Sequence, residues 1–261
     1  MTEQYINSFI LYGAPGMGKT FATAQVMSDA LWIVTRKSNL GGYHSWLDQH
    51  PEEAEELGLK RIRAVVEVPR VTVDKETGAM IPNDVEGTIR HYVQEYTRKV
   101  LSGETKVNGI VIDELSIFCE WVYARIAAKT KGFASWTEIA HWVSEMCDIA
   151  TVTGQHMAFL CHTKDPANYD DGPLRGQIKY RGGPAMPSGK MISAVCAATD
   201  AVLHLDLETS ATGEKRRIIR TDVDTHWERK CRVHGTPAIM ESDLRPLLSK
   251  AGWTFNQQTK E

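Results

Sequence analysis

The sequence predicts an α/β protein with a doubly wound, mostly parallel sheet and an antiparallel extension near the carboxyl end. Short apolar runs, among them SFILY at residues 8–12 and GIVID at residues 109–113, alternate with longer segments of helical composition. This alternation is typical of a parallel sheet whose faces are both covered by helices. Towards the carboxyl end, strand-like runs follow one another without an intervening helix. Short connections of that kind join antiparallel strands.

Each expected element rests on local signals: short apolar runs for strands, and stretches without Gly or Pro for helices. The expected strands are residues 8–12, 31–35, 63–69, 109–113, 156–162, 201–207, 215–223 and 225–233. The expected helices are residues 20–30, an acidic helix before residue 59, a helix ending near residue 101, two helices after residue 114 and a closing helix within residues 241–253. Residues 163–190 are rich in Gly, Pro, Asp and basic residues and are expected to form a long loop. No linker divides the chain, so residues 1–261 are expected to form one domain.

Composition limits the classes of function. The formal net charge is −3, so nucleic-acid binding would need a local basic patch. The five cysteines are scattered and form no CxxC pair, which argues against a disulfide framework or a zinc site and favours a reducing compartment. The amino terminus lacks the features of a signal peptide, and no run of about 18 apolar residues occurs. We therefore expect a cytoplasmic protein without a membrane span.

The stretch GAPGMGKT matches the phosphate-binding pattern G-x-x-x-x-G-K-[ST], with an apolar strand before it and a helix after it. Its residues are Gly13, Ala14, Pro15, Gly16, Met17, Gly18, Lys19 and Thr20. The glycines let backbone N–H groups surround a phosphate, and the following helix adds positive potential. Lys19 is expected to bridge the β- and γ-phosphates, and Thr20 to hold Mg²⁺. The motif predicts binding of a nucleoside triphosphate with Mg²⁺.

Polar residues also end two later strands. Asp113 ends the apolar run at residues 109–113 and Glu114 follows it, and His162 ends the run HMAFLCH. We expect Asp113 to orient Mg²⁺ and Glu114 to polarise the attacking water, which favours hydrolysis over transfer to a substrate hydroxyl. His162 could donate to the γ-phosphate and report its loss to the loop that follows. A strand that ends at solvent, and a histidine satisfied by its neighbours, are the structural alternatives.

The order of these motifs resembles the RecA-like ATPases, in particular the small phage-encoded RecA-like proteins of single-strand annealing and recombination. The similar pieces are LYGAPGMGKT, IVIDEL, FLCHTKDP, the segment RGGPAMPSGKMISAVCAATDAVLHLD and ERKCRVHG, which together span nearly the whole chain. The resemblance implies a RecA-like P-loop fold, ATP and Mg²⁺ as ligands, and a homo-oligomer with ATP at the subunit interface. It also implies that Lys230 and Arg232 reach the γ-phosphate of a neighbouring subunit. Many RecA-like enzymes carry the catalytic acid after the strand at residues 31–35, where this chain has none, so Glu114 is the candidate.

The expected loop after His162 is the candidate nucleic-acid contact, because the corresponding loop of RecA-like proteins binds single-stranded DNA. Basic residues could contact phosphates, and the interleaved Tyr169 and Tyr180 could stack on bases. The candidates are Lys164, Arg175, Lys179, Tyr180, Arg181 and Lys190. A solvated loop with ordinary charges is the alternative.

Three functions are compatible with these features. The first is a Mg²⁺-dependent ATPase that acts on single-stranded DNA in phage recombination or replication. The second is a P-loop ATPase switch or assembly factor that acts on a protein partner, which the near-neutral charge favours. The third, a nucleotide or small-molecule kinase, would need an arginine-bearing lid and a substrate acid that the sequence does not show.

Overall fold

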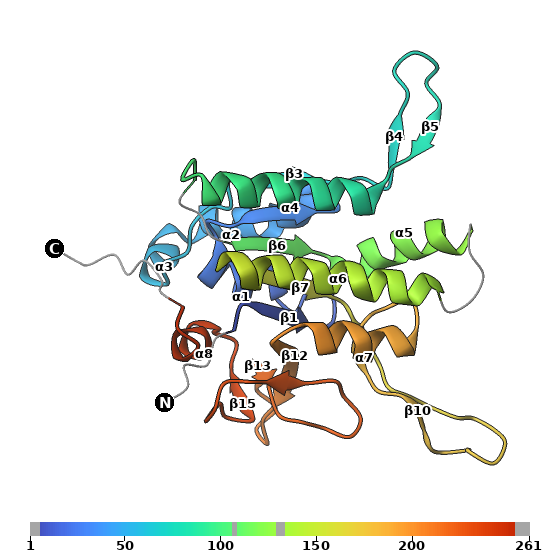
Figure 1. Ribbon diagram of the computed structural model, residues 1–261. Helices are drawn as coiled ribbons and strands as arrows, with labels where there is room; N and C mark the ends of the chain where they lie inside the picture. Colours follow the sequence, from blue (N-terminus) through green and yellow to red (C-terminus); the bar gives the residue numbers. More distant parts are fainter. Residues whose placement is uncertain (1–5, 106–108, 129–133, 254–261) are drawn as a thin grey trace.

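A nine-stranded sheet forms the centre of the molecule (Figure 1). The computed structural model describes residues 6–105, 109–128 and 134–253. Six strands form the parallel part of the sheet: β1 (Ser8–Tyr12), β2 (Leu31–Val34), β3 (Val65–Glu67), β6 (Gly109–Asp113), β7 (His156–Cys161) and β12 (Ala201–Thr209). Three strands join antiparallel: β13 (Lys215–Arg220), β14 (Lys230–Cys231) and β15 (Ile239–Glu241). This arrangement confirms the predicted mostly parallel sheet with an antiparallel extension.

The strand order explains where a site can form. The order is β15-β13-β12-β1-β7-β6-β2-β3, with β14 paired to β12. Because β7 lies between β1 and β6, the chain that follows β7 lies between the segments that follow β1 and β6. The carboxyl ends of β1, β2, β6 and β7 therefore share one edge of the sheet, where ligands of α/β proteins bind. We call this the carboxyl edge, and the opposite one the amino edge.

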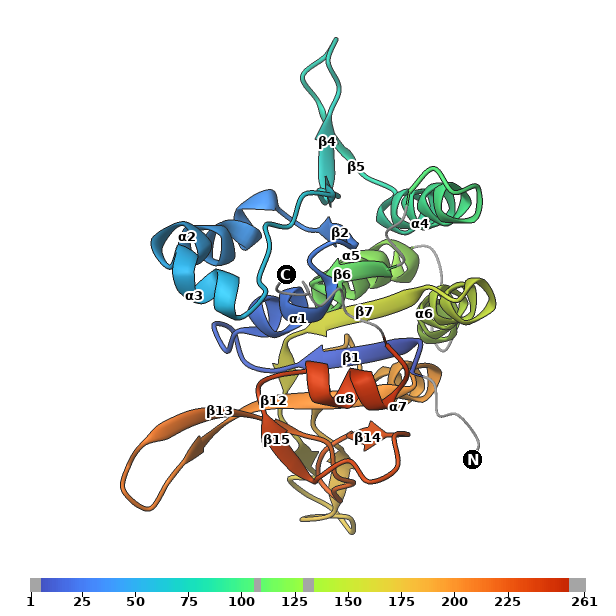
Figure 2. The same ribbon diagram turned by 90° about the vertical axis from the view of Figure 1, so that its left-hand side faces the viewer.

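Helices cover both faces of the sheet (Figure 2). One face carries α1 (Lys19–Met27), α2 (Gly41–Gln49), α3 (Pro51–Glu56) and α8 (Arg245–Lys250). The other face carries α4 (Val85–Leu101), α5 (Leu115–Ala127), α6 (Ala134–Thr153) and α7 (Gly189–Ala198). Successive residues of β1 point to opposite faces, so that Phe9 and Leu11 join one core and Ile10 and Tyr12 the other. Strands buried on both faces read as continuous apolar runs, which is why the sequence identified β1 and β6 with their observed bounds.

Two predicted elements are wrong. Residues 163–190 are not a long loop, because β8 (Thr163–Lys164) pairs with β11 (Gly183–Pro184), and β9 (Ala167–Asn168) pairs with β10 (Ile178–Tyr180). We call residues 163–184 the hairpin extension.

The strand predicted at residues 225–233 is only the two-residue β14. The buried Arg229 donates to Asp222 and Asp224, and these side-chain bonds hold residues 222–229 away from a regular ladder.

A third segment forms an element that the sequence did not predict. β4 (Val71–Val73) and β5 (Met80–Pro82) pair as a hairpin that projects from the body in both views (Figures 1 and 2). We call residues 71–82 the arm. In the described part of the chain, no helix combines the length and apolar character that crossing a membrane requires.

Candidate active site

The phosphate-binding motif forms the turn between β1 and α1, and its glycines are required by backbone geometry. Gly16 and Gly18 have φ angles of 76° and 95°, in the left-handed region that side chains with a Cβ disfavour. A Cβ at Gly13 would lie 2.6 Å from the backbone carbonyl oxygen of Leu205 on β12. The loop is therefore packed directly against β12 at Gly13.

Lys19 begins α1 and turns back into the loop. Its Nζ donates to the carbonyl oxygens of Gly13 at 2.9 Å and Ala14 at 3.2 Å. Burial lowers the pKa of Lys19, and the nearby Asp113 carboxylate partly opposes that shift. A desolvated ammonium held by neutral carbonyls gains more from an anion than an exposed one does, so the geometry favours a phosphate here.

Thr20 and Asp113 supply oxygen ligands of the kind that Mg²⁺ prefers. The Thr20 hydroxyl donates to Asp113 Oδ2 at 3.3 Å. Burial, followed by the neighbouring Glu114 carboxylate, raises the pKa of Asp113 to about 6, although Lys19 and Thr20 lower it. No cluster of His, Cys, Asp and Glu within the described ranges forms an all-protein metal site. Mg²⁺ usually takes one or two protein oxygens and completes its shell with water and phosphate. Thr20 and Asp113 would hold the ion.

Glu114 lies beside the phosphate loop. Side chains that follow two other strands, β7 and β2, hold its carboxylate. Its carboxylate is 2.9 Å from His162 Nε2 and accepts from Thr35 Oγ1 and Asn39 Nδ2, each at 3.4 Å. The hydrogen bond from His162 is the main cause of the lowered pKa of Glu114. A carboxylate that stays ionised next to a phosphate site can accept a proton from water. The structure thus brings Lys19, Asp113, Glu114 and His162 together, as the sequence predicted.

These residues line one open cavity of about 710 Å³. Three residues of this site were missed by sequence reasoning. Thr35 and Asn39 follow β2 at the same carboxyl edge, a position that could have marked them. Arg217 comes from β13 and reaches the cavity across the phosphate loop.

Comparison with known proteins agrees with this geometry. The family model described as an AAA domain matches residues 7–233. The chain belongs to the AAA domain family. A KaiC-like protein from the hyperthermophilic archaeon Pyrococcus horikoshii is similar over 82% of this chain and 77% of its own, with 16% identity and a TM-score of 0.41. None of the curated proteins matches. The family match confirms the prediction of a P-loop ATPase.

Lys230 and Arg232 lie away from the phosphate loop of this AAA domain. β14 pairs with the first residues of β12, at the amino edge of the sheet, whereas the loop lies at the carboxyl edge. Arg232 pairs with Asp200 at 2.9 Å, and Lys230 Nζ donates to the carbonyl of Ala197 at 3.2 Å. The predicted strand face that would present both cations is absent, because the ladder of β14 ends at Cys231. Their contact with a neighbouring chain stays a prediction.

The predicted nucleic-acid residues divide into two groups in the hairpin extension and its flank. Lys164 donates to the carbonyl of Met186 and lies over the ring of Tyr180, and Arg181 lies 4.0 Å from Glu228. A Cβ at Gly189 would lie 2.6 Å from Tyr180, so one edge of that ring is already packed.

Arg175 and Lys179 lie in the outer part of the hairpin extension, where Lys179 lies 5.9 Å over the ring of Tyr169. Tyr169, 36% exposed, is a better stacking candidate than Tyr180. Lys190 lies in the first turn of α7, 5.7 Å over the Trp136 ring.

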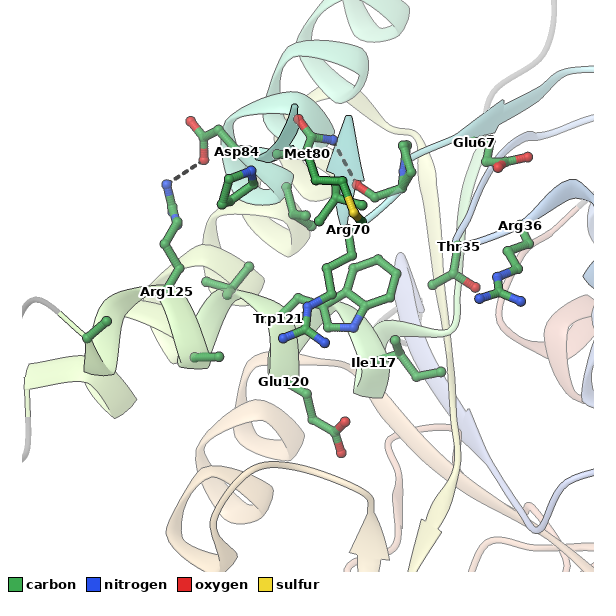
Figure 3. A pocket seen from close by; sticks show the side chains of 18 residues that line it. Thr35, Arg36, Glu67, Arg70, Met80, Asp84, Ile117, Glu120, Trp121 and Arg125 are labelled. Carbon is green, nitrogen blue, oxygen red and sulfur yellow. Dashed lines mark hydrogen bonds and ion pairs between the residues drawn. The ribbon is translucent and has the colours of Figure 1, made fainter. Parts of the chain in front are cut away.

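A second cavity, of about 1370 Å³, adjoins the site (Figure 3). Its walls come from the base of the arm and from α5, and Thr35, which hydrogen-bonds Glu114, forms part of it. In Figure 3 the side chain of Arg70 lies beside the indole of Trp121, and Arg125 is paired with Asp84. We call this cavity the arm groove. Thr35 is therefore a neighbour both of the arm groove and of the candidate base Glu114.

Proposed function

We propose that this AAA domain is a Mg²⁺-dependent ATPase in which Glu114 activates the attacking water. The observation that carries the proposal is the position of the Glu114 carboxylate. It lies in the same cavity as Lys19 and Thr20, and His162 fixes it at 2.9 Å. A base must be within reach of the water and must be ionised. The location of Glu114 in the cavity of the phosphate loop supports the first condition, and its lowered pKa supports the second.

The proposed reaction uses the chain's own groups as follows. Lys19 leaves the carbonyls of Gly13 and Ala14 and binds the phosphates. Glu114 takes a proton from water while the water oxygen bonds to the γ-phosphorus. The bond from that phosphorus to the bridging oxygen breaks, which yields ADP and inorganic phosphate. When bound, Mg²⁺ neutralises part of the phosphate charge. His162 keeps Glu114 oriented.

Single-stranded DNA is the proposed partner, and a role in phage recombination or replication is part of the proposal. The support is the position of His162. It hydrogen-bonds Glu114, and the hairpin extension begins at the next residue of the chain. A change at the γ-phosphate could therefore move the outer part of the extension, where Tyr169, Arg175 and Lys179 lie. Self-association with ATP at the interface is proposed with it.

The test is ATP hydrolysis with and without single-stranded oligonucleotides, together with the mass of the complex in solution. We expect hydrolysis that requires Mg²⁺ and increases with DNA. Fluorescence anisotropy at low salt, with a non-hydrolysable ATP analogue, measures DNA binding directly. An absence of binding under these conditions contradicts the DNA role and leaves the ATPase proposal standing.

A protein partner is the second candidate, and the arm favours it. Val73 and Met80 face each other across the arm and are 61% and 70% exposed, and Ile81 is 44% exposed. Exposed apolar side chains on a projecting hairpin are typical of an interaction element. Substituting Val73 and Met80 by Ser should leave basal ATP hydrolysis unchanged and remove partner stimulation if the partner is a protein. DNA stimulation should be unaffected.

A further inference from the structure

We propose that Arg217 binds the triphosphate held by its own chain and stabilises the charge that develops there during hydrolysis. This inference rests on the proposed ATPase function and names an additional catalytic residue for it. Arg217 lies on β13, about 200 residues after the phosphate loop in sequence, yet it lines the same cavity as Lys19, Asp113 and Glu114.

Backbone packing fixes the position of β13 relative to the loop. Gly13 approaches the carbonyl of Leu205 so closely that no Cβ fits between them. Leu205 pairs with Ile219, and two steps along the same ladder Leu207 pairs with Arg217. The contact between Gly13 and β12 therefore sets how far the Arg217 backbone lies from the loop. A rigid element that carries a cation to a phosphate site is what catalytic positioning requires.

The alternation of side chains then aims Arg217 at the loop. Residues two apart on a strand share a face, and Ile219 is fully buried in the core that also contains Leu11 and Ala22. Arg217 extends from that same face where the core ends and the loop begins. Its Nε lies 3.7 Å and its Cζ 3.9 Å from the position that a Cβ of Gly18 would occupy. The guanidinium thus covers the loop at the residue before Lys19.

Arg217 also differs from its neighbours in charge pairing. Arg216 points to the other face and pairs with Glu208 and Glu241, and Arg220 pairs with Asp206. Within the described residues, Arg217 has neither an ion pair nor a hydrogen bond to its side chain. A guanidinium without a carboxylate partner beside a phosphate loop is free to bind phosphate oxygens, for which its planar fork is suited.

The chemical role needs no proton transfer at Arg217. While the bond to the bridging oxygen breaks and Glu114 receives the proton from water, negative charge increases on the phosphate oxygens. A fixed guanidinium stabilises that charge more than it stabilises the ground state. In this scheme the activating cation acts within one chain, in place of the pair Lys230 and Arg232 acting between chains.

The first experiment compares Arg217→Ala and Arg217→Lys with Arg216→Ala, the matched arginine on the opposite face. For Arg217→Ala we expect kcat to fall about 100-fold and the affinity for a non-hydrolysable ATP analogue to fall about three- to tenfold. Arg217→Lys should retain part of kcat because the charge remains. Arg216→Ala should stay within about twofold of wild type in both, since exposed ion pairs contribute little. Equal kcat and equal affinity in Arg217→Ala and Arg216→Ala would overturn the inference.

The second experiment decides whether Arg217 acts within its chain. Lys19→Ala and Arg217→Ala chains are co-expressed with different tags and purified over both. If Arg217 acted on a neighbouring chain, the Lys19→Ala chain would present its intact Arg217 to the intact phosphate loop of the Arg217→Ala chain. ATP hydrolysis would then be restored in the mixed assembly. We expect mixed assemblies to stay inactive. If the mass in solution shows that each chain is monomeric, action of Arg217 between chains is excluded as well. A wild-type chain without ATP hydrolysis would contradict the proposed function, while the analogue affinities would still test the phosphate contact.

Discussion

The charged side chains at the two edges of the central sheet differ in how they are partnered. At the carboxyl edge, Lys19, Asp113 and Glu114 are crowded together. Burial lowers the pKa of Lys19 and raises that of Asp113, and the hydrogen bond from His162 lowers the pKa of Glu114. At the amino edge, Asp200 has its partners within the fold. It accepts from the backbone N–H groups of Asn7 and Ser8 at 2.9 and 3.0 Å, and Arg232 donates to its other oxygen at 2.9 Å.

This difference separates groups that await a ligand from groups that hold the fold together. Buried charges without matched partners cost stability and persist where function needs them. Buried charges with full hydrogen bonding stabilise local structure and are poor at binding anything else. Substitutions at the carboxyl edge should therefore reduce activity and spare stability, and substitutions at the amino edge should do the reverse.

The largest expected effect is at the carboxyl edge. Glu114→Gln keeps the size and the hydrogen-bonding capacity of the side chain but removes the base, so kcat should fall by about 100- to 10,000-fold. Nucleotide affinity, measured with the non-hydrolysable analogue, should change little. Glu120→Gln is the matched control because Glu120 lies on α5 in the arm groove and outside the cavity of the phosphate loop. Turnover of Glu114→Gln near the wild-type rate would contradict its assignment as the base.

The next effect is on stability at the amino edge. Asp200→Ala leaves the N–H groups of Asn7 and Ser8 without their acceptor and Arg232 without its carboxylate. The free energy of unfolding should decrease by about 3 kcal/mol, because each buried donor left unsatisfied costs about 1–3 kcal/mol. Urea denaturation measures the change.

Asp171→Ala in the hairpin extension serves as the control, since Asp171 is exposed. It should lie within about 0.5 kcal/mol of wild type. Specific ATPase activity of folded Asp200→Ala should equal that of wild type. Lost activity without lost stability would reverse the comparison between the edges.

The sequence could predict the part of the site that depends on strand ends. The phosphate loop directly follows an apolar run, Asp113 and His162 each end one, and the carboxyl ends of parallel strands meet at one edge. That rule needs no knowledge of strand order, so it also placed Glu114 correctly. The same rule extends to Thr35, which ends the run at residues 31–35.

The part that depends on the packing of β12 against the phosphate loop and on the register of β13 along β12 could not be predicted. Arg217 reaches the loop because Leu207 pairs with it, and no local pattern in KRRIIR fixes that pairing. From composition alone, KRRIIR is equally typical of a strand whose basic side chains face solvent. The strand predicted at residues 225–233 was wrong for another reason, since the ion pairs of Arg229 with Asp222 and Asp224 depend on side-chain contacts that strand propensity does not show.

A third prediction concerns pH and again contrasts the edges. His156 begins β7 at the amino edge, and its ring stacks on Trp253 with centroids 3.6 Å apart. Burial lowers the pKa of His156 to about 4 from an ordinary value of 6.5. The folded state thus disfavours the protonated ring, so the stability that neutral His156 provides is complete above pH 6.5 and is lost as the pH falls towards 4.

The expected loss between pH 6.5 and 4.5 is on the order of 2 kcal/mol. His156→Phe keeps a stacking ring and removes the titration. Its free energy of unfolding should depend less on pH over that interval than that of wild type. Identical slopes for the two proteins would show that His156 titrates normally in the folded chain.

The smallest expected effect tests the cations of the amino edge. Lys230→Ala and Arg232→Ala remove charges that lie at the level of the first residues of β12, while the phosphate loop lies beyond its middle. Each should change kcat by less than about threefold, against about 100-fold for Arg217→Ala, because a cation acts on a phosphoryl group only at contact distance. Arg232→Ala should also destabilise the fold slightly through Asp200, by about 0.5 kcal/mol, as expected for a largely exposed ion pair.

If Lys230→Ala instead abolished turnover in an assembled form while ATP binding persisted, the amino edge of one chain would be completing the carboxyl edge of another. The contrast between the two edges would then be a property of the single chain, lost on assembly.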